Sequence, residues 1–491
     1  MPVSIGAYEM VVSVPSFLGL YQDGDGVDVD PKYALEAVNV DTTGGVLRPA
    51  ARCPHLLPAL PGAIGTLARL YRRWGAPGAQ DVLVAASGGA LYWMLPGGAE
   101  WTSIAPPEGV EAYQSDTWSW VTYEINPEGS EAPVDVLLLS NAIDGMIMVR
   151  GDDLSASIVP TPKKFGVISR YAERIWGGAI LDDPDMLVYS APFDPFNWEQ
   201  NSEFPEDGAG DVSQPSWDGD SFTALVAFGS QLIAMKRNRV WRILGTDPGQ
   251  YVFKEQYGGG ALFWDTVVPV GERILMLGRG GLWQYDGLTV QPYYQQFAKT
   301  VFERMNQNAL SGACACMYKD RYYCALPLDG SPHNNAVLVL NMTEKTWLLR
   351  DGITVKDFLP TDDALYFTSA TDPGRVYRWG EDARANGAAP CRWVSPWLTG
   401  GRKDARCGGW TWYFSVRADS PVELVLTVRT EKKAKAKRYK ADATAPGDVP
   451  KQKRLHIGGS GRRFRFEIES AGGAAFELDG GLQINVERDE D

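Results

Sequence analysis

The sequence contains few of the residue types on which metal sites and nucleophilic catalysis depend. Its 491 residues include only three histidines, His55, His333 and His456, and six cysteines, the closest pair being Cys314-Ala315-Cys316. No Cys-x-x-Cys pair and no Gly-x-Ser-x-Gly motif occurs, and the histidines lie far apart. Zinc sites and Ser–His catalysis require such groups at defined spacings. We therefore predict no metal, no cofactor, no catalytic residue and no enzymatic activity.

Long apolar runs and targeting signals are also missing. No stretch of about 18 apolar residues is present, so we predict no membrane span. Residues 1–15 lack the basic and apolar regions of a secretory signal, and we expect folding in a reducing cytoplasm. The acidic segment Asp23–Asp30 lacks the glycine and glutamate positions of an EF-hand, which favours an acidic loop over a calcium site.

Positive charge is scarce over most of the chain. The net charge of −14 argues against a protein that coats nucleic acid, because such proteins need excess Lys and Arg. Residues 431–465 are the exception, with twelve Lys or Arg against three Asp or Glu, a local charge of +9 against −23 elsewhere. The run beginning at Lys432 reads as a solvated hairpin tip. Its basic residues are Lys432, Lys433, Lys435, Lys437 and Arg438.

Glycine, proline and aromatic residues are plentiful and indicate many short strands joined by turns. An aromatic-bearing strand recurs at intervals of roughly 42 to 53 residues, as in Leu91-Tyr92-Trp93 and Leu282-Trp283-Gln284. Apolar runs such as Val82–Ala85 precede most repeats and suit inner blade strands buried on both faces. We predict an all-β chain with an N-terminal arm and ring-closing strand (1–61), a six- or seven-bladed β-propeller (62–385) and a C-terminal β-sandwich (386–491).

Two segments interrupt the repeat. Phe297, Val301 and Met305 recur at four-residue spacing, which predicts an amphipathic helix over 294–308 that plugs one end of the ring. Residues 201–220 read as a long acidic loop. Its acids are Glu203, Glu206, Asp207, Asp211, Asp218 and Asp220.

Several segments, taken in order, resemble tailed-phage tail nozzle proteins (tail tubular protein B-like), a class of β-propeller virion proteins. Ser16–Leu20, Ala37–Asp41 and Gly45–Pro49 are similar to the family's opening motifs, although Ala50–Arg52 departs from its usual Arg-Pro-Gly ending. Further matching segments are Arg174–Gly178, Leu187–Pro192, Asp194–Trp198, Leu225–Phe228, Val240–Pro248, Gly280–Gly287, Gly461–Phe466 and Phe476–Gly480.

This resemblance implies a structural subunit of a homo-oligomeric ring, commonly a hexamer, in the virion tail and assembled in the bacterial host cytoplasm. Such a ring forms part of the DNA channel, retains the genome, and docks fibres and other tail or head–tail adaptor proteins. Double-stranded DNA would pass without sequence-specific binding.

The two charged segments acquire roles within that ring. Carboxylates repel phosphate, so we expect the acidic segments to face the channel or an interface. The basic run would contact a neighbour's acidic face or, alternatively, DNA at the channel mouth.

A different class of function remains open from the sequence, a propeller glycan hydrolase or carbohydrate-binding module acting on the host surface. Paired carboxylates on propeller loops could supply such chemistry, with Asp182, Asp183 and Asp185 as candidates.

Overall fold

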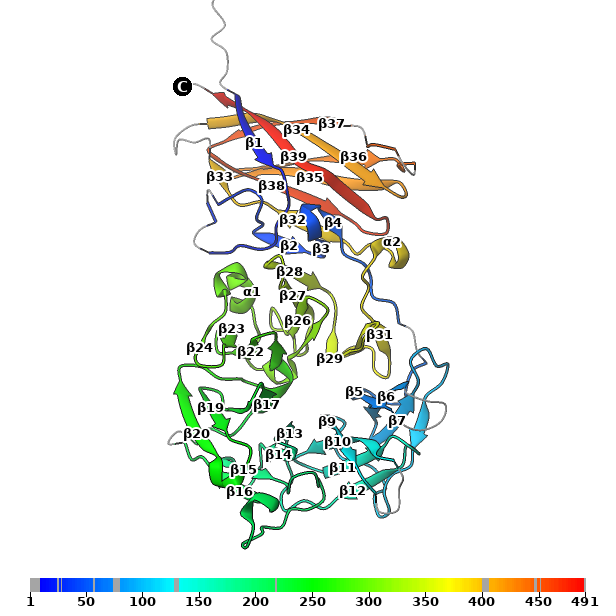
Figure 1. The fold of residues 1–491 in the computed structure, drawn as a ribbon. Coiled ribbons are helices and arrows are strands. Elements are labelled where there is room, and N and C mark those ends of the chain that lie inside the picture. Colours follow the sequence, from blue (N-terminus) through cyan, green and yellow to red (C-terminus); the bar gives the residue numbers. More distant parts are fainter. Residues whose placement is uncertain are drawn as a thin grey trace, which may run out of the picture.

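The chain folds into a propeller and a β-sandwich stacked end to end (Figure 1). A computed structural model describes residues 9–23, 26–27, 29–55, 58–73, 80–127, 132–216, 219–399, 406–445, 448–450 and 452–489. The predicted all-β architecture, with its propeller, N-terminal arm and C-terminal sandwich, is confirmed. None of the helices in these ranges is long and apolar enough to cross a membrane.

Seven antiparallel blades surround a central axis in the described part of the chain. Six have four strands, and the seventh has three. Blades one to three comprise β5 (Ile64–Arg72), β6 (Gln80–Ser87), β7 (Ala90–Met94), β8 (Thr102–Ile104); β9 (Ser119–Ile125), β10 (Val134–Asn141), β11 (Gly145–Arg150), β12 (Ala156–Val159); and β13 (Val167–Tyr171), β14 (Arg174–Gly178), β15 (Met186–Tyr189), β16 (Gly210–Ser213). Blades four to seven comprise β17 (Ala224–Phe228), β18 (Gln231–Met235), β19 (Arg239–Leu244), β20 (Val252–Tyr257); β21 (Val268–Val270), β22 (Arg273–Gly278), β23 (Gly281–Tyr285), β24 (Val290–Pro292); β25 (Cys314–Tyr318), β26 (Arg321–Leu326), β27 (Ala336–Asn341), β28 (Thr346–Asp351); and β29 (Val355–Pro360), β30 (Leu365–Ser369), β31 (Val376–Arg378).

The apolar runs form inner strands of the blades, as predicted. Each blade begins at the axis with its first strand, and the continuous apolar segments form the second strands, such as β10, which is buried throughout. Both faces of a second strand are covered by the neighbouring blades, and this produces the apolar pattern.

The ring closes between the seventh and first blades. The backbone N–H of Leu67 on β5 donates to Oδ2 of Asp357 on β29 at 2.6 Å. A shared apolar cluster that includes Ile64 and Leu359 packs across the same junction. On the outer side of the seventh blade, the arm residue His55 makes a β-bridge to Tyr377 of β31.

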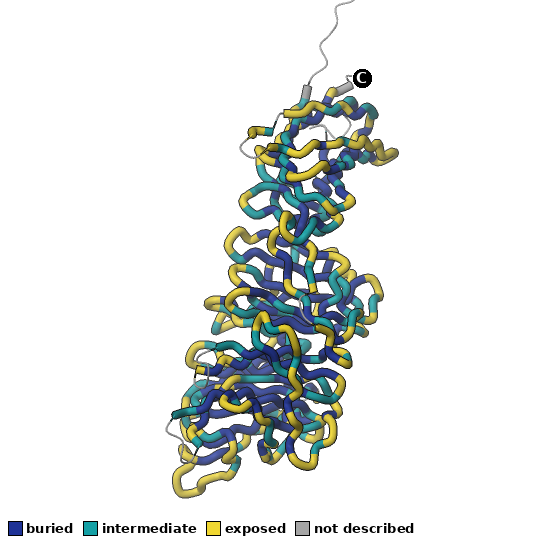
Figure 2. Tube along the Cα trace, turned by 90° about the vertical axis from the view of Figure 1, so that its right-hand side faces the viewer, coloured by how far each residue is buried: buried dark blue, intermediate teal, exposed yellow. Residues whose placement is uncertain are grey.

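The arm joins the two bodies. Strand β2 (Glu36–Val38) lies between β28 of the sixth blade and β32 (Cys391–Val394), so one ten-stranded sheet runs from the propeller into the sandwich. Gly19 passes directly over the backbone of Trp347, where a side chain would overlap the Trp347 carbonyl oxygen. Phe17 is fully buried and meets the ring of Trp393 edge-on at 5.2 Å. One hydrophobic core therefore continues from blades five to seven through the arm into the sandwich (Figure 2).

The sandwich packs two sheets through a layer of aromatic side chains, with Trp412 edge-on to Phe466 at 5.3 Å. The chain's two ends meet in one sheet, where β1 pairs with β39. That sheet has the order β1 (Glu9–Val14), β39 (Phe476–Asp489), β34 (Arg406–Ala418), β37 (Lys453–Gly461). The other continues from β32 through β38 (Arg463–Ser470), β35 (Val422–Thr430) and β36 (Ala434–Ala441), with β33 (Leu398–Thr399) beside β38.

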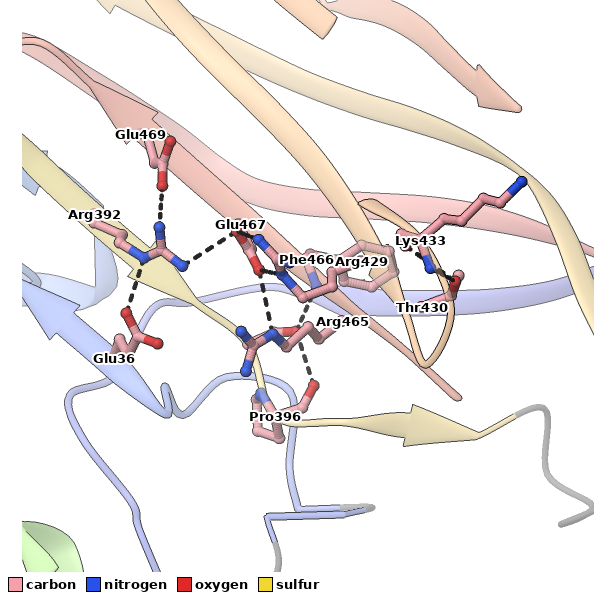
Figure 3. A network of polar contacts seen from close by, with 11 residues as sticks. Glu36, Arg392, Pro396, Arg429, Thr430, Lys433, Arg465, Phe466, Glu467 and Glu469 are labelled. Carbon is pink, nitrogen blue, oxygen red and sulfur yellow. Dashed lines mark hydrogen bonds and ion pairs between the residues drawn. The ribbon is translucent and has the colours of Figure 1, made fainter. Parts of the chain in front are cut away.

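A buried carboxylate organises the outer face of this second sheet. Glu467 of β38 is 2 % exposed and accepts hydrogen bonds from Arg392, Arg429 and Arg465, while Arg392 also contacts Glu36 of the arm (Figure 3). Burial alone would raise the pKa of Glu467, but the Arg429 hydrogen bonds and the three guanidinium charges lower it. The network ties the arm to the sandwich electrostatically.

Helical structure is short everywhere. The predicted helix over 294–308 is wrong: α1 spans only Lys299–Glu303 and follows a 3₁₀ turn, Gln295–Phe297, that begins after the left-handed Tyr294. It packs beside the arm, where Gln22 accepts the Thr300 backbone N–H through its side chain. The remaining small elements are β3 (Val40–Asp41), β4 (Arg48–Pro49), α2 (Ala383–Asn386), and the 3₁₀ turns Thr43–Gly45, Pro205–Asp207, Pro248–Gln250, Trp264–Thr266 and Leu310–Gly312.

Candidate functional site

The predicted acidic loop lies at the outer edge of the third blade. Residues 201–209 connect β15 to β16, the outermost strand, and project at the end of the molecule remote from the sandwich, whereas 210–213 form β16 itself (Figure 1). The buried guanidinium of Arg174 anchors it by donating to the carbonyl oxygens of Ser190, Glu206 and Gly208. These hydrogen bonds fix the backbone of the loop, which lies away from the propeller's own axis.

The six predicted acids do not form one surface. Glu203, Glu206, Asp207 and Asp211 are exposed, and no ion pair to them exists within the described ranges. Asp211 belongs to strand β16, so the prediction of one continuous loop is wrong. Asp220 is buried and forms an ion pair with Arg237 at 2.8 Å, while Asp218 lies outside the described residues. We call the four exposed acids the acidic rim.

The basic run lies on a hairpin at the opposite body of the molecule. Lys432 and Lys433 form the turn, while Lys435, Lys437 and Arg438 lie on β36, the last strand of its sheet. All five are exposed, and only Arg438 forms an ion pair among the described residues, with Glu423 at 3.1 Å. We call these five residues the basic edge.

The basic edge also has a purely structural explanation. A terminal strand exposes unpaired backbone groups, and lysines on such a strand discourage uncontrolled pairing with other sheets. Among the described strands, β36 pairs with β35 alone, so its other edge is open. A partner that binds at this edge would need negative charge to offset the repulsion between its own cations and these lysines.

The structure brings together two carboxylates that the sequence does not pair. Asp357 on β29 and Asp265, just before β21, lie close to the axis on either side of β25. Burial raises the pKa of Asp265 well above its usual range, and the Asp357 charge adds to this. Burial likewise raises the pKa of Asp357, against the hydrogen bonds from the Leu67 and Phe358 backbones. Burial thus favours the protonated form of both carboxyl groups, and Asp357 accepts the Leu67 N–H at the junction that closes the ring.

The carboxylates proposed from sequence for glycan chemistry are otherwise engaged. Asp182 pairs with Lys163 at 2.9 Å on the surface. Asp185 pairs with Lys236, whose side chain is completely buried between the third and fourth blades. Asp183 lies close enough for its charge to act on Lys163 as well. The hydrogen bond from Lys163 lowers the pKa of Asp182, so Asp182 is poorly suited to donate a proton.

A pocket of about 570 Å³ lies across the first three blades. Tyr71, Tyr123 and Phe193 line it together with the ion pair Arg170–Glu173. Phe193 is 73 % exposed although its backbone is held at a φ of 61°. No cluster of three His, Cys, Asp or Glu in the described ranges could hold a metal ion.

Comparisons with known proteins identify no family for this chain. No family model matches the sequence, and no curated protein matches it. Among solved structures, the Pan2 WD40 domain of Neurospora crassa is 10% identical, covers 67% of this chain and 95% of its own, and gives a TM-score of 0.37. BBS1N in complex with ARL6DN is 10% identical, covers 67% of this chain and 98% of its own, and gives a TM-score of 0.38. An exo-beta-1,3-galactanase from Phanerochaete chrysosporium is 9% identical, covers 89% of this chain and 100% of its own, and gives a TM-score of 0.28.

Proposed function

We propose that this protein is a non-enzymatic structural subunit of a bacteriophage tail, part of a nozzle-type ring on the head–tail axis. The observation that supports this most directly is the sheet and core shared by propeller and sandwich, with β2 inserted between β28 and β32. Such a joint resists bending, which suits a protein that carries load between neighbours. The sequence resemblance supplies the phage context, including assembly in the host cytoplasm and docking of adaptor proteins and fibres.

We further propose that copies associate head to tail within the ring. The acidic rim and the basic edge lie on opposite bodies of the molecule (Figure 1), and most of their charges have no partner within the described part of the chain. Contact between two different surfaces generates a closed ring when the rotation closes. Opposite charge would fix the register of the contact more than its affinity. Acidic residues left facing the channel would keep DNA mobile.

Charge reversal with compensation tests the contact. Lys433→Glu, Lys435→Glu and Lys437→Glu together should abolish ring assembly, followed by mass photometry and cryo-EM of tails. Adding Glu203→Lys, Glu206→Lys and Asp207→Lys to the same chain should restore it. The matched control reverses three exposed lysines elsewhere, Lys254, Lys299 and Lys345. Rings from the first variant, or equal loss in the control, would rule out this contact.

A carbohydrate-binding role is the second candidate, and the pocket across the first three blades favours it. Exposed aromatic rings beside polar groups are the usual lining of small-molecule sites, and Tyr71 and Phe193 provide them. Binding of host-surface polysaccharide by the intact protein, lost in Phe193→Ala, would support this role. Cleavage of the polysaccharide that Asp357→Asn abolishes would instead indicate a glycan hydrolase.

A further inference from the structure

A cleft of about 440 Å³ lies where the sixth blade, the arm and the sandwich meet. Its walls come from β26 and β28 of the blade, from the arm around β3 and β4, and from β34 and β39 of the sandwich. Six basic side chains line it, along with six acidic ones. The basic residues are Arg48, Lys319, Arg321, Arg350, Arg384 and Arg417.

Most of the carboxylates are already occupied by the surface cations. Lys319 pairs with Glu381 at 2.7 Å, and Arg384 pairs with Asp419 at 3.0 Å. Glu477 is shared by Arg48 and Arg384. The Asp382 carboxylate caps α2. Asp41 and Asp320 are the remaining carboxylates of the lining, and Asp41 is the one that reaches Arg321, at 3.8 Å.

Arg350 lies in the deeper part of the cleft and forms no ion pair with a described residue, although the charge of Asp41 acts on it from a distance. It is 6 % exposed, its guanidinium stacks on Trp379 at 4.9 Å, and one N–H donates to the Ala51 carbonyl oxygen. Its Nε is buried and has no hydrogen-bond partner, and no carboxylate pairs with it in the described ranges. Burial raises the pKa of the adjacent Cys53 thiol, so the thiol is neutral and supplies no counterion.

A second cation beside it is only loosely held. Arg321 is 3.8 Å from Asp41 and donates to Oγ1 of Thr43 at 2.8 Å. Arg417 is half-buried and forms no ion pair with any described residue. A buried guanidinium without compensation is costly, and planar guanidinium groups match the geometry of oxyanions.

We infer that this cleft binds a small oxyanion, a phosphate or carboxylate group, anchored by Arg350 and assisted by Arg321. The anion would pair with the guanidinium charge of Arg350 and link the blade to the sandwich. This inference is independent of ring assembly, since the cleft lies within one chain.

Anion-dependent unfolding of the intact protein tests the inference. The melting temperature is followed against sodium phosphate and sodium acetate separately, with sodium chloride as the reference at equal ionic strength. A specific site gives saturable stabilisation, because the gain follows the logarithm of ligand over Kd. General salting effects grow without saturation. The more effective of the two anions identifies the class of ligand.

Variants locate the effect. The Arg321 side chain is half-buried and outside the core, so Arg321→Gln tests the site without disturbing the core. This variant should raise the apparent Kd for the anion at least fivefold. Arg350→Met should remove saturation altogether. Arg150→Gln, on the second blade, is the matched control and should bind as the wild type does. Should Arg350→Met fail to fold, Arg321→Gln and Arg417→Gln decide. Unsaturable stabilisation, or saturation unchanged in Arg321→Gln, would overturn the inference.

Discussion

Replacing Lys236 with methionine should loosen the contact between the third and fourth blades. The Lys236 ammonium is completely buried, pairs with Asp185, and donates to the Gln214 carbonyl at 3.0 Å and to Oγ of Ser216 at 3.1 Å. Its Nζ also lies 4.8 Å from the ring centre of Phe222. Methionine keeps the aromatic packing but leaves three polar groups without their donor.

The expected cost follows from those three groups. At about 1 kcal/mol for each neutral acceptor and somewhat more for the carboxylate, the loss is about 3 to 4 kcal/mol. Asp185 is itself 24% exposed, which keeps the cost at the lower end of the range for broken buried pairs, about 3–5 kcal/mol. The free energy of local opening should fall by that amount, so amides of β15 and β18 should exchange roughly 150- to 700-fold faster.

Hydrogen–deuterium exchange by mass spectrometry on the intact protein measures this directly. Lys163→Met provides the matched control, because Lys163 also pairs with an aspartate of the third blade but lies at the surface. It should leave exchange unchanged. If Lys236→Met left the amides of β15 and β18 within threefold of wild type, the buried ammonium would contribute nothing to blade cohesion, and the reasoning would be refuted.

Three further changes have distinct expected outcomes. Glu467→Gln should lower the free energy of unfolding in urea by about 3 kcal/mol at pH 7, because three arginines lose the buried negative charge that they share. The difference from wild type should shrink as pH falls through the lowered pKa of Glu467, and equal unfolding curves at pH 7 would contradict this. Asp357→Asn should melt higher than wild type at pH 8 and equally at pH 4, because the raised carboxyl pKa weakens the wild type as pH rises, and an unchanged difference across that range would exclude the effect. Gly19→Ala should detach the arm from Trp347, seen as faster exchange of the β2 amides and earlier proteolysis of the arm, whereas wild-type protection would show that the backbone can shift.

The repeat in the sequence predicted the blades because each strand's character is local. Runs such as Val136–Leu139 identify a strand buried on both faces, and aromatic residues such as Trp93 mark the next one. The same pattern cannot distinguish the first strand of a blade from the second, since contacts with neighbouring blades decide which is covered. The pattern therefore predicts an inner strand but not its distance from the axis.

The charged surfaces and the junction cleft differ in how far sequence reveals them. The lysines of the basic edge are adjacent in sequence, so their clustering was visible at once. Arg350 follows the apolar run Trp347–Leu349 and precedes Asp351 at the end of β28, a pattern that is ordinary for a strand end and gives no local sign of the cleft. Its setting depends on Ala51, Cys53 and Trp379, which the fold alone brings together. The acidic rim was visible as a cluster, but the burial of Asp220 against Arg237 was not.

The pairing of β1 with β39 sets an order of events during biosynthesis. The first strand of the described chain has its partner in the last described one, residues 476–489, so its backbone cannot be paired until those residues have emerged. Strand β2 likewise waits for β32. During that interval the arm is available to other edges, including those of nascent neighbours. Completion of the monomer is thus a late, long-range step, and long-range pairings of this kind slow folding.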